Sequence, residues 1–176
     1  MATIEETLNR LEETEDMLRR SQRAARLGTY VLDIPSGVWK SSPLLDEIFG
    51  IGRDFPHTVE GWGQIVHPDM RQEMLGYFRN EVAGKGHRFD RTYMIVRPSD
   101  GETRWVQGFG DLEFDASGKP VRMIGTIQDI TELRRAQEAE ARAAELERIT
   151  KIMTGRELKM AELKREIERL RHEKGA

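Results

Sequence analysis

Apolar residues near the amino terminus recur in alternating steps of four and three positions, with two polar interruptions. The positions on this spacing are Ile4, Leu8, Leu11, Glu15, Leu18, Gln22 and Ala25. A heptad seam of this kind predicts an amphipathic helix over residues 1–26, which Gly28 is expected to end. The helix can lie on its own domain or pair with a second copy, and the polar interruptions weaken the second use.

From residue 27 the pattern changes to short apolar runs separated by turn residues, and residues 27–131 are expected to form one globular domain. Runs at 29–34 and 38–40 flank a Pro-Ser-Gly turn and predict a first hairpin. Short helices are expected at 44–49, which Gly50 stops, and at 59–66. These elements predict a hairpin followed by small helices.

A longer helix is expected to begin at His67-Pro68-Asp69 and to end at Gly84 and Gly86. Proline suits the first helical turn, and an aspartate there is favourable to the helix dipole. His67 and Asp69 also have the residue types of a catalytic base and its partner, but the start of a helix explains both more simply.

Three strands are predicted next, at 89–97, 103–114 and 121–130. Asp100-Gly101 supplies the positive backbone angles of a tight turn between the first two, so the strands form an antiparallel meander. The first of them carries apolar side chains on both faces, which means that its outer face needs a cover. The amino-terminal helix or a second subunit can supply that cover.

Several short motifs in this region combine into a pattern that resembles a known family. They are Arg97-Pro98, Asp100-Gly101, Arg104-Trp105-Val106, Gly118-Lys119-Pro120, Gly125-Thr126 and Asp129-Ile130-Thr131-Glu132. With the order of elements, they make residues 23–132 resemble a PAS domain of the subclass common in bacterial sensor kinases and diguanylate cyclases. The resemblance implies an α+β fold with a five-stranded antiparallel sheet. It also implies short helices on one face around a possible small-ligand cavity, and signal output through the helix after the last strand.

Beyond Glu132 the chain reads as one long charged helix over residues 132–174, with a strict seam in its second half. Seven apolar residues occupy that seam: Leu146, Ile149, Met153, Met160, Leu163, Ile167 and Leu170. This spacing predicts a coiled coil and a homodimer. Thr154-Gly155-Arg156-Glu157 matches a capping box, but the seam keeps its phase across it, which favours a continuous helix. The charges that flank the seam do not decide whether the two helices pair in parallel or antiparallel. Parallel pairing rests on the resemblance.

Composition removes several classes of function. Charged residues make up 34% of the 176, but their signs are interleaved and the net charge is −3, so a nucleic-acid partner is not expected. The chain has no cysteine, which fits a reducing cytoplasm and excludes disulfides, thiolate metal sites and the cysteinyl adduct of LOV-type flavin sensors. No run approaches the roughly 18 apolar residues of a membrane span, so direct membrane insertion is not expected.

The remaining residues give candidates for the two ends of a sensor. If a ligand binds, we expect it between the longer helix and the inner sheet face, lined by Trp39, Phe49, Met74, Tyr93 and Ile95. The resemblance places the axial histidine of haem-binding PAS relatives within the longer helix, and residues 69–83 contain no histidine, so haem is disfavoured. No catalytic residue and no metal site is predicted, so we do not expect an enzyme.

At the other end, Asp129 or Thr131 is expected to cap the last helix, and the resemblance assigns the same two residues to signal output. The sequence thus predicts a cytoplasmic, dimeric sensor that relays a signal through its coiled coil to an effector, such as a two-component histidine kinase or a diguanylate cyclase. The alternative is a ligand-free dimerisation scaffold with a filled core.

Overall fold

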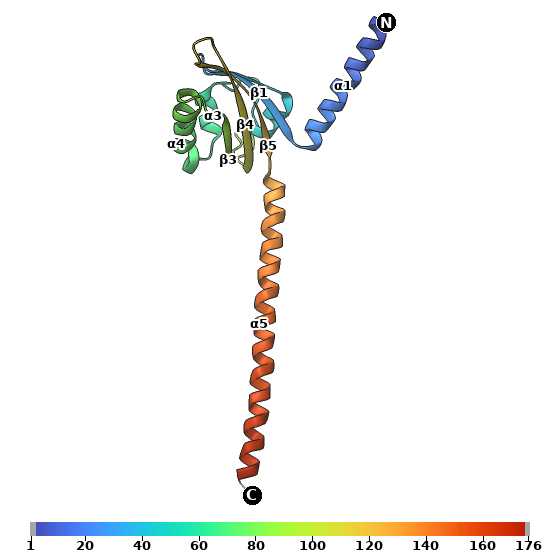
Figure 1. Ribbon diagram of the computed structural model, residues 1–176, viewed down its shortest axis with the longest axis vertical. Helices are drawn as coiled ribbons and strands as arrows, with labels where there is room; N and C mark the ends of the chain where they lie inside the picture. The colour runs from blue at the N-terminus through green and yellow to red at the C-terminus, as the bar shows by residue number, and fades with distance from the viewer. Residues whose placement is uncertain (1–2, 175–176) are drawn as a thin grey trace. The chain divides into compact units, whose positions relative to one another are not determined.

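Five antiparallel strands form a single sheet in the order β2-β1-β5-β4-β3 (Figure 1). The computed structural model describes residues 3–174. The strands are β1 (Leu27–Asp33), β2 (Val38–Ser41), β3 (Phe89–Val96), β4 (Thr103–Phe114) and β5 (Pro120–Asp129). The predicted hairpin and meander are therefore confirmed, and β5 joins them because it pairs with both β1 and β4.

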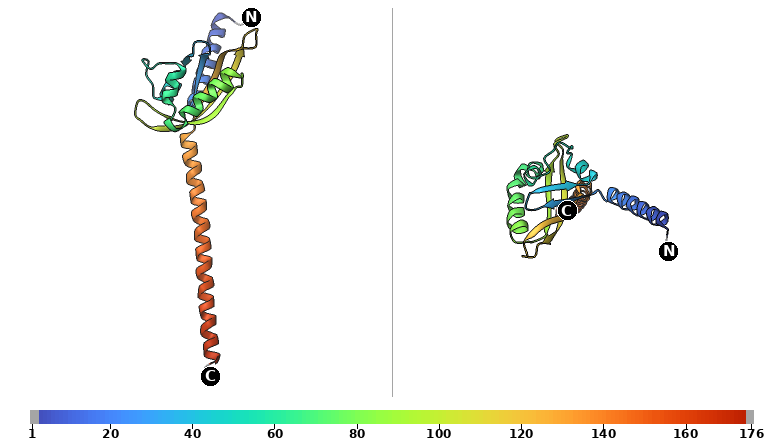
Figure 2. Two further views of the ribbon diagram at one scale, coloured as in Figure 1. Left: turned by 90° about the vertical axis from the view of Figure 1, so that its left-hand side faces the viewer. Right: turned by 90° about the horizontal axis from the view of Figure 1, so that it is seen from above.

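The short helices cover one face of this sheet (Figure 2). They are α2 (Pro43–Phe49), α3 (Val59–Ile65), α4 (Pro68–Tyr77) and the π-helix η1 (Phe78–Gly84). The core lies between this layer and the inner sheet face, where Tyr93, Ile95 and Val106 are fully buried. The free edge of β3 is capped by the turn before α4, because the His67 N–H donates to the Met94 carbonyl at 2.9 Å.

Local sequence explains where these helices begin and end. The Ser42 hydroxyl accepts the N–H of Leu45 at 3.3 Å and starts α2. Gly50 ends α2 in the left-handed conformation, with φ of 66°, which glycine adopts without steric cost. His67 starts α4 through its Nδ1, which accepts the N–H of Asp69 at 3.3 Å. The simpler interpretation of His67 and Asp69 as a helix start is thus consistent with the structure.

The end of the first helix differs from the prediction. Helix α1 (Ile4–Ala24) stops before Arg26, a residue with a positive φ of 49°, and Gly28 lies inside β1. A Cβ at Gly28 would approach the Cα of Leu45 to 2.7 Å. Gly28 is therefore required for the close approach of α2 to β1, and not for ending a helix.

Helix α1 does not cover the outer sheet face. No residue of α1 is buried. On that outer face Phe109 is 41% exposed and Ile124 is 43% exposed. The sequence predicted that either the amino-terminal helix or a second subunit covers this face. A second subunit remains as a proposal.

The chain divides after Thr131 into two compact units, and the second holds helix α5 (Thr131–Lys174) beyond its first residue. Helix α5 passes through Gly155 without a break, as the unbroken seam predicted. The Thr154 hydroxyl does not cap a new helix, because it donates to the Thr150 carbonyl one turn earlier at 2.9 Å.

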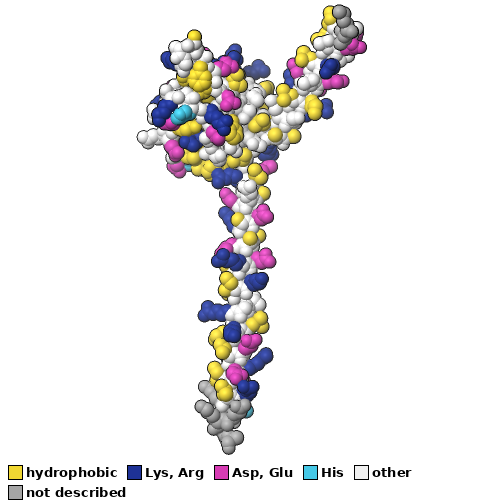
Figure 3. All heavy atoms as spheres, in the orientation of Figure 1, with side chains coloured by type: hydrophobic (Ala, Val, Ile, Leu, Met, Phe, Trp, Pro, Cys, Tyr) yellow, Lys and Arg dark blue, Asp and Glu magenta, His cyan; other side chains and the backbone are white. Residues whose placement is uncertain are grey.

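Hydrophobic side chains stay exposed between charged ones along α5 (Figure 3). Within residues 3–174, no helix combines the length and apolar character that a membrane crossing requires.

Candidate functional site

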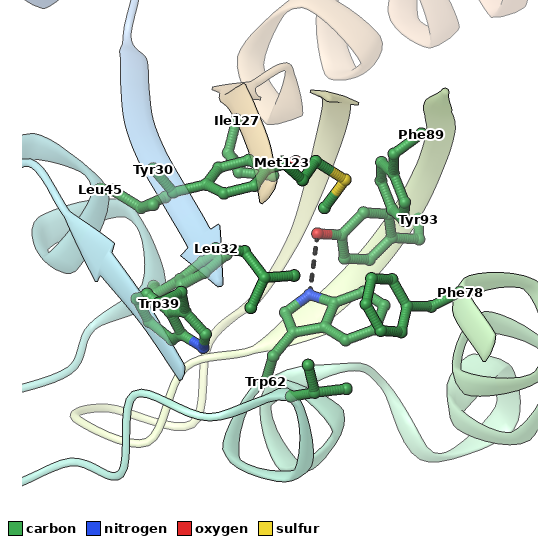
Figure 4. A pocket seen from close by; sticks show the side chains of 12 residues that line it. Tyr30, Leu32, Trp39, Leu45, Trp62, Phe78, Phe89, Tyr93, Met123 and Ile127 are labelled. Carbon is green, nitrogen blue, oxygen red and sulfur yellow. Dashed lines mark hydrogen bonds between the residues drawn. The ribbon is translucent and has the colours of Figure 1, made fainter. Parts of the chain in front are cut away.

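A hydrophobic cavity lies between the helical layer and the inner sheet face (Figure 4). Its lining residues come from every strand except β4, together with α2, α3 and η1. They are Tyr30, Leu32, Trp39, Leu45, Phe49, Val59, Trp62, Phe78, Phe89, Tyr93, Met123 and Ile127. The cavity has a volume of about 50 Å³. Because about 10–15 Å³ by this measure holds one water, the cavity has room for a small molecule.

The structure brings only some of the predicted pocket residues together. Trp39, Phe49 and Tyr93 lie on the cavity wall. Met74 and Ile95 are buried in the surrounding core but are not part of the wall. A role for these five residues in ligand binding stays a prediction.

The wall is built from aromatic rings that meet edge to face. The Trp62 ring lies 5.8 Å from the Tyr93 ring and 6.0 Å from the Phe89 ring, at interplanar angles of 89° and 78°. Edge-to-face pairs at these separations are the favourable arrangement of aromatic quadrupoles. These contacts fix the shape of the wall. No charged side chain is among the residues that line it.

The polar atoms of the wall are used within the protein. The Trp39 Nε1–H donates to the Thr58 carbonyl at 3.0 Å, and the Tyr30 hydroxyl donates to the Phe109 carbonyl at 3.0 Å. The Trp62 Nε1–H donates to the Tyr93 hydroxyl at 3.0 Å. Desolvation raises the pKa of both tyrosines well above their ordinary value, so both hydroxyls are neutral near pH 7.

A second cluster lies at the end of β5, where the sheet leads into α5. The Asp129 Oδ2 accepts from Arg104 Nη1 at 3.0 Å, and the Arg26 guanidinium lies 4.0 Å away. The Asp129 Oδ1 accepts the N–H of Thr131 at 3.0 Å, which agrees with the expected capping role. One buried carboxylate thus joins β4, the turn between α1 and β1, and the first residue of α5.

Thr131 holds the same junction to β4 from the other side. Its hydroxyl oxygen accepts the N–H of Trp105 at 3.0 Å, and the hydroxyl donates to the Trp105 carbonyl at 3.4 Å. The N–H of Ile130 donates to the same carbonyl at 2.9 Å. The backbone between β5 and α5 is therefore fixed to one residue of β4. We refer to Arg104, Asp129 and Thr131 as the junction.

Charge balance explains how Arg104 is held beside this buried carboxylate. Its guanidinium also donates to the Glu102 carboxylate, from Nη2 at 2.8 Å and from Nε at 3.0 Å. Burial acts to lower the pKa of Arg104, and the two carboxylates outweigh it, so the net pKa is raised. Arg104 is a permanent cation at the start of β4.

Sequence reasoning missed Arg104 and most of the cavity wall. Arg104 stood in a quoted motif, but nothing local relates it to Asp129, 25 positions later. The pairing of Val106 with Asp129 brings the two residues together, because Arg104 lies two positions before Val106 on the same face of β4. Within residues 3–174, no group of three or more histidine, aspartate or glutamate side chains is placed to hold a metal ion.

Comparisons with known proteins place this geometry in a family. The sequence profile of the PAS fold matches residues 38–127. A structure of a sensory box histidine kinase/response regulator from Burkholderia thailandensis E264 is 25% identical with a TM-score of 0.58, and the alignment covers 74% of this chain and 97% of that chain. The N-terminal domain of a diguanylate cyclase with a PAS/PAC sensor from Marinobacter aquaeolei is 18% identical with a TM-score of 0.56, covering 61% of this chain and 98% of that chain.

One relative by sequence is an uncharacterized protein from Pseudomonas chlororaphis. It is 35% identical over 71 residues, which are 39% of this chain and 28% of that protein. The aligned part therefore spans less than a third of that relative's length.

Proposed function

Because the chain belongs to the PAS family, we propose that it is the sensory module of a signal-transduction protein, binding a small ligand in the aromatic cavity and relaying the change through the junction to α5. The carrying observation is that one strand serves both sites. Met123 and Ile127 of β5 line the cavity, and Asp129 ends the same strand. A ligand that displaces Ile127 acts on backbone only two residues from the junction carboxylate.

The junction is suited to holding one of two arrangements. Two of its bonds run from β4, one to Asp129 and one to Thr131, so a shift of β5 along β4 breaks or remakes them together. Such a relay is a shift in population between two packings, biased by a ligand that prefers one of them. We assign Asp129 and Thr131 to signal output on this basis.

The output helix supports a homodimer. Its seam residues are exposed within the single chain, with Leu146 at 65% and Leu163 at 49%. Exposed apolar residues at heptad spacing are stabilised by pairing with a second copy, and we propose parallel pairing. The similarity to the sensory box histidine kinase/response regulator and to the diguanylate cyclase with a PAS/PAC sensor supports an effector of either kind downstream, including a two-component pathway.

A filled-core scaffold that only dimerises is the second candidate. The observation in its favour is that the cavity is small, at about 50 Å³, and that Tyr30, Trp39 and Trp62 on its wall donate their hydrogens to oxygens of the protein. Such a wall is stable without a ligand. The scaffold and the sensor therefore differ in whether small molecules bind, and not in oligomeric state.

Native mass spectrometry of the purified chain tests the proposal. We expect a dimer that carries a small bound mass, which is lost on denaturation, or that shifts its melting temperature with at least one compound of a metabolite panel. A dimer with neither property favours the scaffold. A monomer at all concentrations contradicts both candidates.

A further inference from the structure

The chemistry of the cavity wall restricts the class of ligand, on the premise of the proposed function that this cavity is the ligand site. Seven of the twelve lining side chains are aromatic, and none is charged. A charged ligand would lose its hydration without gaining a counter-ion, which is strongly unfavourable. The wall therefore selects uncharged molecules with a large apolar surface.

One hydrogen-bond donor on the cavity wall is available to a ligand. The Tyr93 hydroxyl accepts from Trp62, but its own hydrogen finds no acceptor among the described residues. Tyr93 is 0% exposed, so water at the surface does not take that hydrogen. In Figure 4 its oxygen points into the space between Trp62 and Met123. A buried hydroxyl donor without an acceptor is unfavourable, and a ligand oxygen there relieves it.

The other hydrogen-bond donors of the wall, unlike Tyr93, are already paired within the protein. The hydrogens of Tyr30, Trp39 and Trp62 are all donated to oxygens of the protein. A ligand with several polar groups would leave most of them unpaired. The wall offers one donor, and it matches one acceptor.

We propose that the ligand is a small uncharged molecule with one apolar ring and a single acceptor oxygen, which takes the hydrogen of the Tyr93 hydroxyl. The chemical class includes ring-bearing ketones, aldehydes and esters. Carboxylates, amines and sugars are excluded by charge or by their number of polar groups.

Three probes of similar size test the class by calorimetry on the full chain: acetophenone, ethylbenzene and benzoate. We expect acetophenone to bind about tenfold more tightly than ethylbenzene, because one buried hydrogen bond is gained. Benzoate is expected not to bind. Equal affinity for acetophenone and ethylbenzene, or binding of benzoate, overturns the proposed class while the cavity remains a ligand site. Binding of none of the three overturns the class, and the native mass spectrum and metabolite panel then show separately whether the cavity binds any ligand.

Infrared spectroscopy of bound acetophenone locates the contact without a mutation. We expect the carbonyl stretch to lie below its frequency in hexane, as it does for a hydrogen-bonded ketone. The single variant Tyr93→Phe leaves the Trp62 N–H without its acceptor, so that N–H could itself donate to the ligand. The double variant Tyr93→Phe/Trp62→Phe removes both polar atoms and is therefore the clearer test. It should abolish the frequency shift and the tenfold preference. The control Tyr77→Phe removes a tyrosine hydroxyl that lies outside the cavity wall and donates to the Arg88 carbonyl, and it should keep both. An unshifted carbonyl in the wild type overturns the proposal.

Discussion

The guanidinium of Arg104 donates to the Asp129 carboxylate at 3.0 Å, and the Asp129 side chain is only 2% exposed. The pair lies where the last strand leads into α5, and Thr131 donates its N–H to the other carboxylate oxygen. A buried carboxylate in this position is stable only while its cation and its N–H donor stay in place. The arrangement of the sheet end and the beginning of α5 are therefore coupled through one side chain.

Removing the cation of this pair should be costly. We predict that Arg104→Met lowers the free energy of unfolding by about 3 kcal/mol, because it leaves a buried carboxylate without its main partner. Urea denaturation at pH 7 measures the loss. The control is Arg122→Met, whose partner Glu113 lies 3.5 Å away with both side chains about half exposed. Arg122→Met should lower the free energy of unfolding by less than about 1 kcal/mol. Equal losses in the two variants would contradict the burial argument.

Close packing at Gly28 gives a second prediction. Gly28→Ala places a methyl group 2.7 Å from the Cα of Leu45, and backbone does not yield easily. We expect a loss of about 2 kcal/mol or more in the free energy of unfolding. Gly76→Ala is the control, since Gly76 lies in α4 with no atom within 4 Å of the added methyl group. It should raise stability by up to about 1 kcal/mol. A tolerated Gly28→Ala shows that α2 is free to move away from β1.

Local patterns in the sequence predicted the elements, while contacts between distant residues stayed out of reach. The turn at Gly101, the stop at Gly50 and the unbroken helix through Gly155 depend on neighbouring residues only. Gly28 was misassigned because a glycine after a helix is usually a cap, and only the position of Leu45 shows its packing role. The cavity wall draws on seven elements, and Asp129 gives no local sign that its partner is Arg104.

The buried tyrosines predict a loss of stability in alkali. Burial raises the pKa of Tyr30 and Tyr93 in the folded state above the ordinary value of 10.0. Above about pH 10 the unfolded chain releases protons that the folded chain keeps, so the free energy of unfolding falls as pH rises, by up to about 1.4 kcal/mol per pH unit for each tyrosine. Below that pH the contribution is fully present. Denaturation midpoints between about pH 9 and pH 11 should fall less in Tyr30→Phe/Tyr93→Phe than in the wild type. Parallel curves for the two proteins would rule out this source of the decline.

The seam of α5 predicts which leucines hold the dimer. Leu163 lies on the heptad seam and Leu158 lies off it, and both are exposed in the single chain. We expect Leu163→Lys to weaken dimerisation at least about tenfold, because it places a charge in the paired seam. Leu158→Lys should leave the dimer unchanged. Sedimentation equilibrium over a range of concentrations separates the two. Equal effects of the two variants, or none, would argue against a coiled-coil dimer.

The central claim is that the junction at Asp129 sets the arrangement of the paired α5 helices. The chain has no cysteine, so Lys151→Cys provides one spin label per copy on the outer face of α5. Double electron–electron resonance then measures the distance between the labels in the dimer, with the wild-type junction and with Asp129→Asn, which keeps an acceptor for Thr131 but removes the charge. We predict a defined distance in the wild type that shifts by about 1–2 Å or more, or broadens, in Asp129→Asn. Superimposable distance distributions in the two proteins would contradict the relay.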